Sequence, residues 1–345
     1  MKITTSIGIS VFPDDGINAE EILINVDEAM YKAKELGKSR YHFFDNRMKE
    51  GLDQKIKLET MLKNAISNHE FVLHYQPQYE ARTRRLRGFE ALIRWNNPEV
   101  GLVMPMDFIP FAEETAFVVP IGKWVIDTAC KVCNTINNSY GLNLYMSVNI
   151  SAIQLKQTDF KESVMNAIIN SGIEASNLEL EVTESCFIEN FDNVVSVLKA
   201  LQDEGIRITL TDFGTGNLAL SHLKNMPINM VKLDKEFIDE IDQSNPQGAL
   251  TESIISLVHK LNIEMLAGGV ENKEQFDYLI KGKCDNIQGY FFEQPVPEEM
   301  IEGIISKGIL ENEALSKVIQ KAGLTYEGFV RQKMRLIGRQ WDTKL

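Results

Sequence analysis

Apolar and polar positions follow two alternating periods from Phe71 onward. Short apolar runs typical of buried strands alternate with amphipathic helical segments. Four of the strand-like runs are Leu144 to Ile150, Leu178 to Val182, Ile206 to Leu210 and Met230 to Leu233. This alternation predicts an α/β fold with a largely parallel sheet covered by helices. About eight strand candidates over about 235 residues favour a closed, TIM-like (β/α)8 barrel over an open doubly wound sheet.

The segments that flank this barrel have simpler patterns. Residues 1–46 are predicted to form a strand, a helix and a strand, over Ile3 to Phe12, Ala19 to Leu36 and Arg40 to Phe44. Residues 47–69 are charged with one apolar stripe, which indicates a connecting helix. Residues 306–345 are basic and helical in pattern, and we expect a helical tail that is solvated or docked, or else contacts a partner or an anionic surface.

Composition limits the classes of protein. Hydrophobic residues make up 44% of the chain and charged residues 25%, as in soluble globular proteins. The net charge of -13 argues against a general nucleic-acid surface, because phosphate backbones select basic grooves. A small anionic ligand neutralised locally by a cation is compatible with it. The sequence has no apolar run long enough to span a membrane and no signal peptide, so we expect a cytoplasmic location.

Cysteine usage gives no sign of a disulfide framework. The four cysteines are scattered, and a cytoplasmic chain would keep them reduced. Cys130 and Cys133 form a C-x-x-C pair within a predicted amphipathic helix, Trp124 to Ile136, but no second pair completes a zinc site. Helix packing is therefore the preferred interpretation of this pair.

Polar residues occur where predicted strands end. In a barrel of this type the reactive groups lie on the face formed by the carboxyl ends of the strands. One such residue alone would be a solvated strand end, but several together suggest a site. Their oxygen donors, without His or Cys, suit Mg²⁺ or Mn²⁺, which polarise phosphates and activate water. The six candidates are Glu90, Asn149, Glu181, Asp212, Lys232 and Gln288.

Six motifs around these residues resemble the EAL family, whose barrels bind or hydrolyse the bacterial messenger cyclic di-GMP. They are EALIRWNNPEVGLVMPMDFIPFAEET, VNISAIQL, LELEVTES, DFGTG, VKLD and QGYFFEQP, in the family's order. The resemblance covers roughly Phe71 to Ile305, so residues 70–305 are interpreted as the EAL domain. SIGISVFPDDG and DEAMYKAKELGKSRYHFF are similar to the end of a GGDEF (diguanylate cyclase) domain. Residues 1–46 are therefore interpreted as a truncated GGDEF domain without its signature, from which we expect no cyclase activity.

The resemblance implies a role for each matched residue. The metal ligands would be Glu90, Asn149, Glu181 and Asp212, and the cofactor Mg²⁺ or Mn²⁺. The residues implied for catalysis are Lys232 beside the attacking water, Gln288 lining the site, and Glu184 anchoring the loop after DFGTG. The ligand-binding residues would be Arg94 at a phosphate, Gln76 at a guanine edge, and Asp234. From the residues alone, Arg94 could instead extend over the barrel rim and Gln76 could cap a strand.

Two departures from the family pattern affect the metal site. Thr211 replaces the first aspartate of D-D-F-G-T-G, and Gly268 replaces the glutamate of A-E-G-V-E. Asn217-Leu218-Ala219 also replaces an aromatic residue and two serines. Two metal ions held about 4 Å apart need bridging negative charge, which threonine cannot supply.

Two functions remain open after this comparison. A binding module would sense cyclic di-GMP with little or no hydrolysis, whereas an active phosphodiesterase would produce linear pGpG. The missing acids favour the binding module, with a weak or partly lost metal site. A barrel that has lost even the ligand is disfavoured because Arg94 and Gln76 persist. A homodimer through the EAL domain is a further expected assembly.

Overall fold

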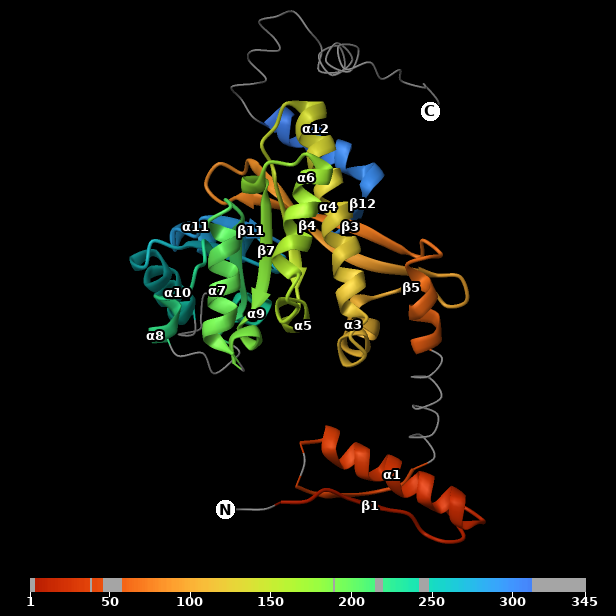
Figure 1. The fold of residues 1–345 in the computed structure, drawn as a ribbon. Helices are drawn as coiled ribbons and strands as arrows, with labels where there is room; N and C mark the ends of the chain where they lie inside the picture. Colours follow the sequence, from red (N-terminus) through yellow and green to blue (C-terminus); the bar gives the residue numbers. More distant parts are fainter. Residues whose placement is uncertain are drawn as a thin grey trace, which may run out of the picture. The chain divides into compact units, whose positions relative to one another are not determined.

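The computed structural model describes residues 4–37, 39–45, 58–188, 190–214, 220–241 and 248–311. The chain divides into two compact units, Met1–Asn68 and His69–Leu345, and each is described by itself (Figure 1). None of the helices in these described ranges is long and apolar enough to cross a membrane. The predicted connecting helix is helical over residues 58–65, and its earlier part lies outside the described residues.

Besides the helical residues 58–65, the first unit contains a strand, a helix and a strand, as the pattern predicts. Strands β1 (Ile7–Ile9) and β2 (Tyr41–Phe43) pair in parallel, joined by α1 (Ala19–Glu35). The side chain of Asn18 caps α1 by accepting a hydrogen bond from the Glu21 amide. A Cβ at Gly8 would collide with the Val26 carbonyl and the Met30 amide. Glycine is therefore needed for the close approach of β1 to α1.

The strand pairings of the second unit form a closed barrel of eight strands, which confirms the predicted fold class. Six neighbouring pairs are parallel, and β3 closes the ring by pairing antiparallel with both β4 and β11. Two short strands, β5 (Gly101–Val103) and β12 (Val296–Pro297), add antiparallel to β4 and β3. The barrel strands are β3 (Phe71–Glu80), β4 (Leu86–Asn97), β6 (Tyr145–Ile150), β7 (Leu178–Thr183), β8 (Arg207–Phe213), β9 (Met230–Leu233), β10 (Glu264–Ala267) and β11 (Asn286–Gln288).

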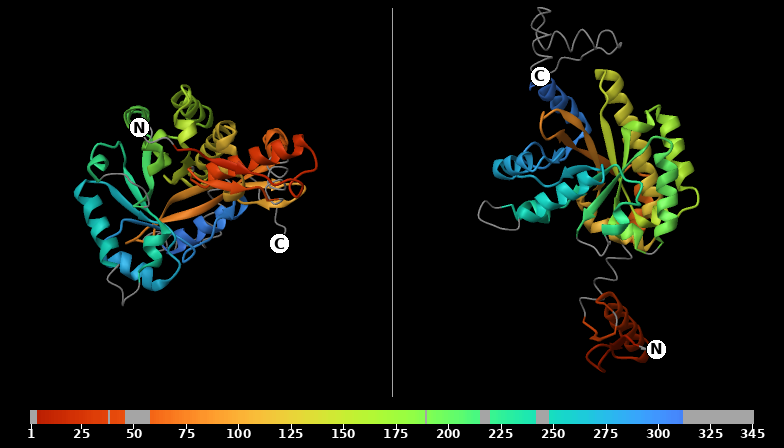
Figure 2. Two further views of the ribbon diagram at one scale, coloured as in Figure 1. Left: turned by 90° about the horizontal axis from the view of Figure 1, so that it is seen from below. Right: turned by 90° about the vertical axis from the view of Figure 1, so that its left-hand side faces the viewer.

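Helices form the layer outside the strands (Figure 2). The longest are α3 (Pro105–Glu114), α4 (Val118–Tyr140), α6 (Phe160–Ser171), α7 (Phe191–Gln202), α10 (Gly248–Lys260), α11 (Lys273–Lys281) and α12 (Ile301–Glu311). Shorter ones are α5 (Ala152–Leu155), α8 (Leu220–Leu223) and α9 (Lys235–Asp239), with 3-10 turns at Ala175–Asn177, Glu184–Phe187 and Glu298–Met300. Of the predicted tail, α12 covers residues up to 311, and residues 312–345 lie outside the described part.

Helix α4 explains the C-x-x-C pair. Cys130 and Cys133 lie on its buried face, and burial raises the pKa of each thiol to about 12. The Cys133 thiol donates to the carbonyl of Leu144 at 3.4 Å. Both cysteines therefore serve as packing residues, as the sequence suggested.

The alternation of residues within the strands separates an apolar outer layer from a polar interior. In β7, Leu178, Leu180 and Val182 are fully buried in the apolar core. Glu179 and Glu181 occupy the intervening positions and are also buried, but they hydrogen-bond to polar side chains of other strands. Because successive side chains of a strand point to opposite faces, these carboxylates face the barrel interior.

Candidate functional site

Five of the predicted site residues form one hydrogen-bonded cluster around Glu90, in which Glu90, Glu181 and Gln288 are buried. Asn149 donates to Glu90 Oε1 at 2.7 Å, and both Lys232 Nζ and Gln288 Nε2 donate to Glu90 Oε2 at 2.6 Å. Lys232 Nζ also donates to Glu181 Oε2 at 2.9 Å. The strand register brings these residues together, since Asn149 on β6 pairs with Glu181 on β7. The cluster thus unites side chains from five strands at one end of the barrel.

The prediction that Glu90 ends its strand is wrong. Strand β4 continues to Asn97. It pairs with β6 only as far as Ala91, and beyond this point it pairs with β3 and β5. Glu90 therefore lies near the barrel rim, although its strand extends past the rim as a hairpin.

The two carboxylates of the cluster differ in their electrostatics. Burial and then the charge of Glu90 raise the pKa of Glu181 to about 7. Burial alone would raise the pKa of Glu90 as well, but the Lys232 ammonium and the bonds from Gln288 and Asn149 hold it below its usual value. The pKa of Lys232 is raised, since the two carboxylates outweigh its desolvation. Lys232 is therefore a fully charged counter-ion for a buried acidic pair.

The DFGTG segment lies beside this cluster. Strand β8 has an irregular register between Leu210 and Phe213, and Asp212 there adopts a left-handed φ of 56°. Partial burial and then the neighbouring charge of Asp234 raise the pKa of Asp212. Glu184 Oε1 accepts the Gly214 amide at 2.9 Å, so it anchors the start of the loop. Residues 215–219, including the altered Asn217-Leu218-Ala219, lie outside the described residues.

The predicted ligand-binding residues have different settings. Gln76 is buried; its Oε1 accepts from Gln288 at 2.9 Å and its Nε2 donates to the Glu293 carbonyl at 3.3 Å. Arg94 on β4 donates to the Ile93 carbonyl at 2.8 Å, and burial lowers its pKa. Asp234 accepts the Glu236 amide at 2.9 Å and so caps α9, a local role that the sequence reasoning did not predict.

The two substituted positions differ in the room that they leave for a longer side chain. Thr211 on β8 pairs with Thr183 on β7 and is buried. A Cβ at Gly268 would lie 3.3 Å from the Leu233 carbonyl and 3.5 Å from Lys232 Cε. The left-handed φ of 77° belongs to the next residue, Gly269. An acid at 268 would therefore point toward Lys232 without requiring a glycine conformation.

The donor atoms of the cluster suit the expected metal only in part. Glu181 Oε1 is buried without a hydrogen-bond partner in the described structure, and together with Glu90 and Asn149 it offers the oxygen donors that a hard cation prefers. The ammonium of Lys232 bridges the two carboxylates, however. Within the described part of the chain, no group of three or more His, Cys, Asp and Glu side chains could hold a metal ion. The residues fit one cation by donor type but do not fit a pair.

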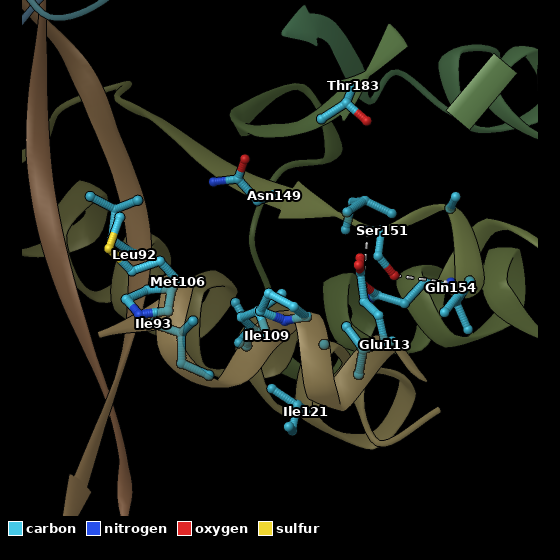
Figure 3. A pocket seen from close by; sticks show the side chains of 18 of the residues that line it. Leu92, Ile93, Met106, Ile109, Glu113, Ile121, Asn149, Ser151, Gln154 and Thr183 are labelled. Atoms are coloured by element: carbon cyan, nitrogen blue, oxygen red, sulfur yellow. Dashed lines mark hydrogen bonds between the residues drawn. The ribbon is translucent and has the colours of Figure 1, made fainter. Parts of the chain in front are cut away.

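A pocket of about 480 Å³ adjoins the cluster (Figure 3) and was not predicted from the sequence. Leu92, Met106 and Ile109 contribute to its apolar wall, while Asn149 and Thr183 lie at the side nearer the strand ends. Asn149 therefore belongs to both the pocket and the polar cluster. The residues of α3 fall within the longest motif of the sequence analysis. From sequence alone, however, apolar residues at the start of a helix look the same whether they line a pocket or pack in the core.

Curated proteins of known sequence resemble most of this chain. The signaling protein YkoW of Bacillus subtilis is 40% identical over 302 residues, which is 88% of this chain and 38% of YkoW. The bifunctional diguanylate cyclase/cyclic di-GMP phosphodiesterase MucR of Pseudomonas aeruginosa is 36% identical, over 87% of this chain and 44% of MucR. The cyclic di-GMP phosphodiesterase PdeR of Escherichia coli is 36% identical, over 86% of this chain and 45% of PdeR. The chain thus spans less than half the length of these relatives.

Solved structures and a family model agree with these relatives. The structure "PaMucR Phosphodiesterase, c-di-GMP complex" has a TM-score of 0.68 at 36% identity, covering 71% of this chain and 99% of that one. The EAL enzyme Bd1971, in its cAMP- and cyclic-di-GMP-bound form, has a TM-score of 0.72 at 32% identity, covering 85% and 77%. The model described as "EAL domain" matches residues 59–295, which is more than half of the sequence. The chain therefore belongs to the EAL domain family.

Proposed function

We propose that this EAL domain binds cyclic di-GMP as a signalling receptor and hydrolyses it slowly or not at all. The observation that carries the proposal is that Thr211 and Gly268 stand where the family pattern has two acids. The acidic pair that remains, Glu90 and Glu181, has the Lys232 ammonium at 2.6 and 2.9 Å as its counter-ion. Two similar structures, those of PaMucR and Bd1971, are complexes with cyclic di-GMP, which supports this choice of ligand.

The charge balance disfavours rapid hydrolysis. EAL domains are metal-dependent in general, and a bound Mg²⁺ or Mn²⁺ would activate water and polarise a phosphate. In this chain, Glu90, Asn149, Glu181 and Asp212 would hold at most one such ion. Thr211 and Gly268 add no charge for a second ion. Since loss of one electrostatic contributor commonly costs about a hundredfold in rate, loss of two makes turnover slow.

The ligand-binding features are retained. The Arg94 guanidinium would donate a charge-assisted hydrogen bond to a phosphate oxygen. The remaining N–H of Gln76 would reach a purine edge, and the apolar pocket beside Asn149 would accept a base against Leu92 and Met106. These contacts need neither Thr211 nor Gly268 to be acidic. Asp234 stays a proposed ligand contact in addition to its capping role.

The second candidate is an active cyclic di-GMP phosphodiesterase producing linear pGpG. The contact between Glu184 and the Gly214 amide favours it, because this contact fixes the backbone two residues after Asp212. Four further expectations stay predictions. They are the lack of nucleic-acid binding, a cytoplasmic location, a homodimer through the EAL domain and the GGDEF origin of residues 1–46.

Isothermal titration calorimetry tests the receptor proposal. With EDTA present, we expect cyclic di-GMP to bind with a Kd of about 1 µM or tighter, and Mg²⁺ to change this little. GTP serves as a control ligand, because it has the same base but lacks the ring of two phosphodiester bonds. Absence of binding heat for cyclic di-GMP, both with EDTA and with Mg²⁺, would reject the proposal.

A further inference from the structure

A second buried polar cluster lies at the opposite end of the barrel interior. Glu179 accepts from Arg87 NH1 at 3.3 Å, from Arg207 Nε at 3.3 Å and from Ser147 at 2.8 Å. Arg207 also donates to Glu264 at 2.8 Å. Burial would raise the pKa of Glu179, but the two arginines and Ser147 hold it below its usual value. The charges of this cluster are therefore balanced without any contribution from the site around Glu90.

A single side chain, Gln78 on β3, joins this cluster to the site. Its Oε1 accepts from Arg87 NH1 at 2.7 Å, and its Nε2 donates to Gln288 Oε1 at 3.3 Å and to Ser147 at 3.4 Å. Gln288 in turn donates to Glu90 and to Gln76. Gln78 is completely buried and Gln288 is 2% exposed, so water does not compete for these bonds.

The two ends of this chain of bonds fix the direction of every amide between them. A guanidinium can only donate hydrogen bonds, so Arg87 requires the oxygen of Gln78 to face it. A carboxylate can only accept, so Glu90 requires the nitrogen of Gln288 to face it. With both conditions met, the nitrogen of Gln78 meets the oxygen of Gln288. Reversal of either amide alone would place like groups against each other.

We propose that Gln78, held by Arg87, is a positioning residue that acts together with Glu90 to fix the amide orientation of Gln288 and, through it, that of Gln76. Gln288 Nε2 then meets Gln76 Oε1 at 2.9 Å, which turns the nitrogen of Gln76 toward the Glu293 carbonyl and leaves it one N–H for a ligand. Gln76 therefore presents a donor to the site, and it selects a purine edge that carries an acceptor. This last step rests on the proposed function, whereas the orientation of Gln288 does not.

The variant Gln78→Glu tests this relay, by which we mean the chain of hydrogen bonds from Arg87 through Gln78 and Gln288 to Gln76. It keeps the size of the side chain and the acceptor for Arg87, but it loses the N–H that Gln288 requires. In the ligand-free protein, Gln288 donates to the Glu90 carboxylate, so we expect a downfield side-chain amide resonance. In the variant this resonance should shift, because the introduced carboxylate repels Gln288 Oε1 and becomes a second acceptor for its N–H groups. The resonance is identified by its absence in Gln288→Leu. For cyclic di-GMP, we expect about tenfold or greater weakening of binding in the variant.

The matched control is Gln275→Glu. Gln275 is also a buried glutamine, and its Nε2 donates to the Ile238 carbonyl at 3.2 Å. Among the described residues, no hydrogen bond joins Gln275 to Gln288. We expect it to cost stability without moving the Gln288 resonance or the affinity. If Gln78→Glu fails to fold, Gln78→Met keeps the volume, and the Gln288 resonance should move there too.

The two readouts separate this inference from the proposed function. A Gln288 resonance that stays in place in the Gln78 variants overturns the relay. A moved resonance with parental affinity overturns its coupling to Gln76. If the parent chain does not bind cyclic di-GMP, the proposed function fails, and the resonance alone still decides whether Gln78 orients Gln288.

Discussion

The Nζ atom of Lys232 lies 2.6 Å from Oε2 of Glu90, in the space where two buried carboxylates would otherwise repel each other. The same ammonium reaches Glu181 at 2.9 Å. This arrangement means that the acidic pair is neutralised by the protein itself. Any metal ion must compete with an ammonium that is covalently part of the chain.

Substitution Lys232→Met should therefore destabilise the fold and open the site to metal. Breaking a buried ion pair costs about 3–5 kcal/mol because a charge is left uncompensated. We expect a lower melting temperature that Mg²⁺ partly restores, while the parent changes little with Mg²⁺, as followed by thermal unfolding. Lys235→Met is the control, because Lys235 also has two acidic partners but its side chain is 45% exposed. An equal rise with Mg²⁺ in the parent and in Lys232→Met would refute this account of the site.

The double substitution Thr211→Asp with Gly268→Glu should restore hydrolysis. Asp at 211 would supply an anion that two cations share. Glu at 268 would need no left-handed φ, and its Cβ would lie 3.5 Å from Lys232 Cε, but strand β9 must shift slightly to relieve the 3.3 Å contact with the Leu233 carbonyl. We expect the rate of pGpG formation to rise by about a hundredfold over the parent. Each single change should recover less than the pair, because such residues act as a unit. No gain in the double variant would show that the missing acids do not limit turnover.

Arg94→Ala should weaken cyclic di-GMP binding by about tenfold to a hundredfold, because a phosphate loses a charged donor. Calorimetry measures the effect. Arg85→Ala is a suitable control, since Arg85 is an exposed arginine whose NH2 group pairs with Glu80. If both variants bind with the parental affinity, Arg94 does not contact the ligand.

Glu113, on the wall of the pocket, should make stability depend on pH. Burial raises its pKa above 4.5, so the folded protein binds this proton more tightly than the unfolded chain. The favourable contribution is present below pH 4.5 and is lost as pH rises through the folded-state pKa. Glu113→Gln should thus melt higher than the parent at pH 7, and the difference should shrink near pH 4. Glu114→Gln, at the neighbouring exposed position, is the comparison variant.

The sequence predicts the barrel well where local pattern decides structure. The runs from Leu178 and from Met230 become β7 and β9, because alternating buried residues determine both the strand and its two faces. The convergence of Glu90, Asn149, Glu181, Lys232 and Gln288 also follows, since strand ends of one barrel meet on one face.

Long-range pairing decides what the sequence could not predict. The antiparallel direction of β3 depends on its partners β4 and β11, which no local pattern contains. The contact of Gln78 with Gln288 spans 210 positions, and Arg87 meets Glu179 across 92. Asp234 as a helix cap and the left-handed Asp212 likewise arise from how the strand ends turn.

Incubation of the parent chain with cyclic di-GMP and Mg²⁺ or Mn²⁺, with chromatographic separation of the products, tests the central claim most directly. The site retains the groups proposed to hold the ligand. Lys232 neutralises its acidic pair, however, and Thr211 and Gly268 stand where the family pattern has acids. We predict that the dinucleotide is recovered almost entirely in its cyclic form. Formation of linear pGpG at the rate of ordinary enzymes, about 1 per second or faster, would contradict the account.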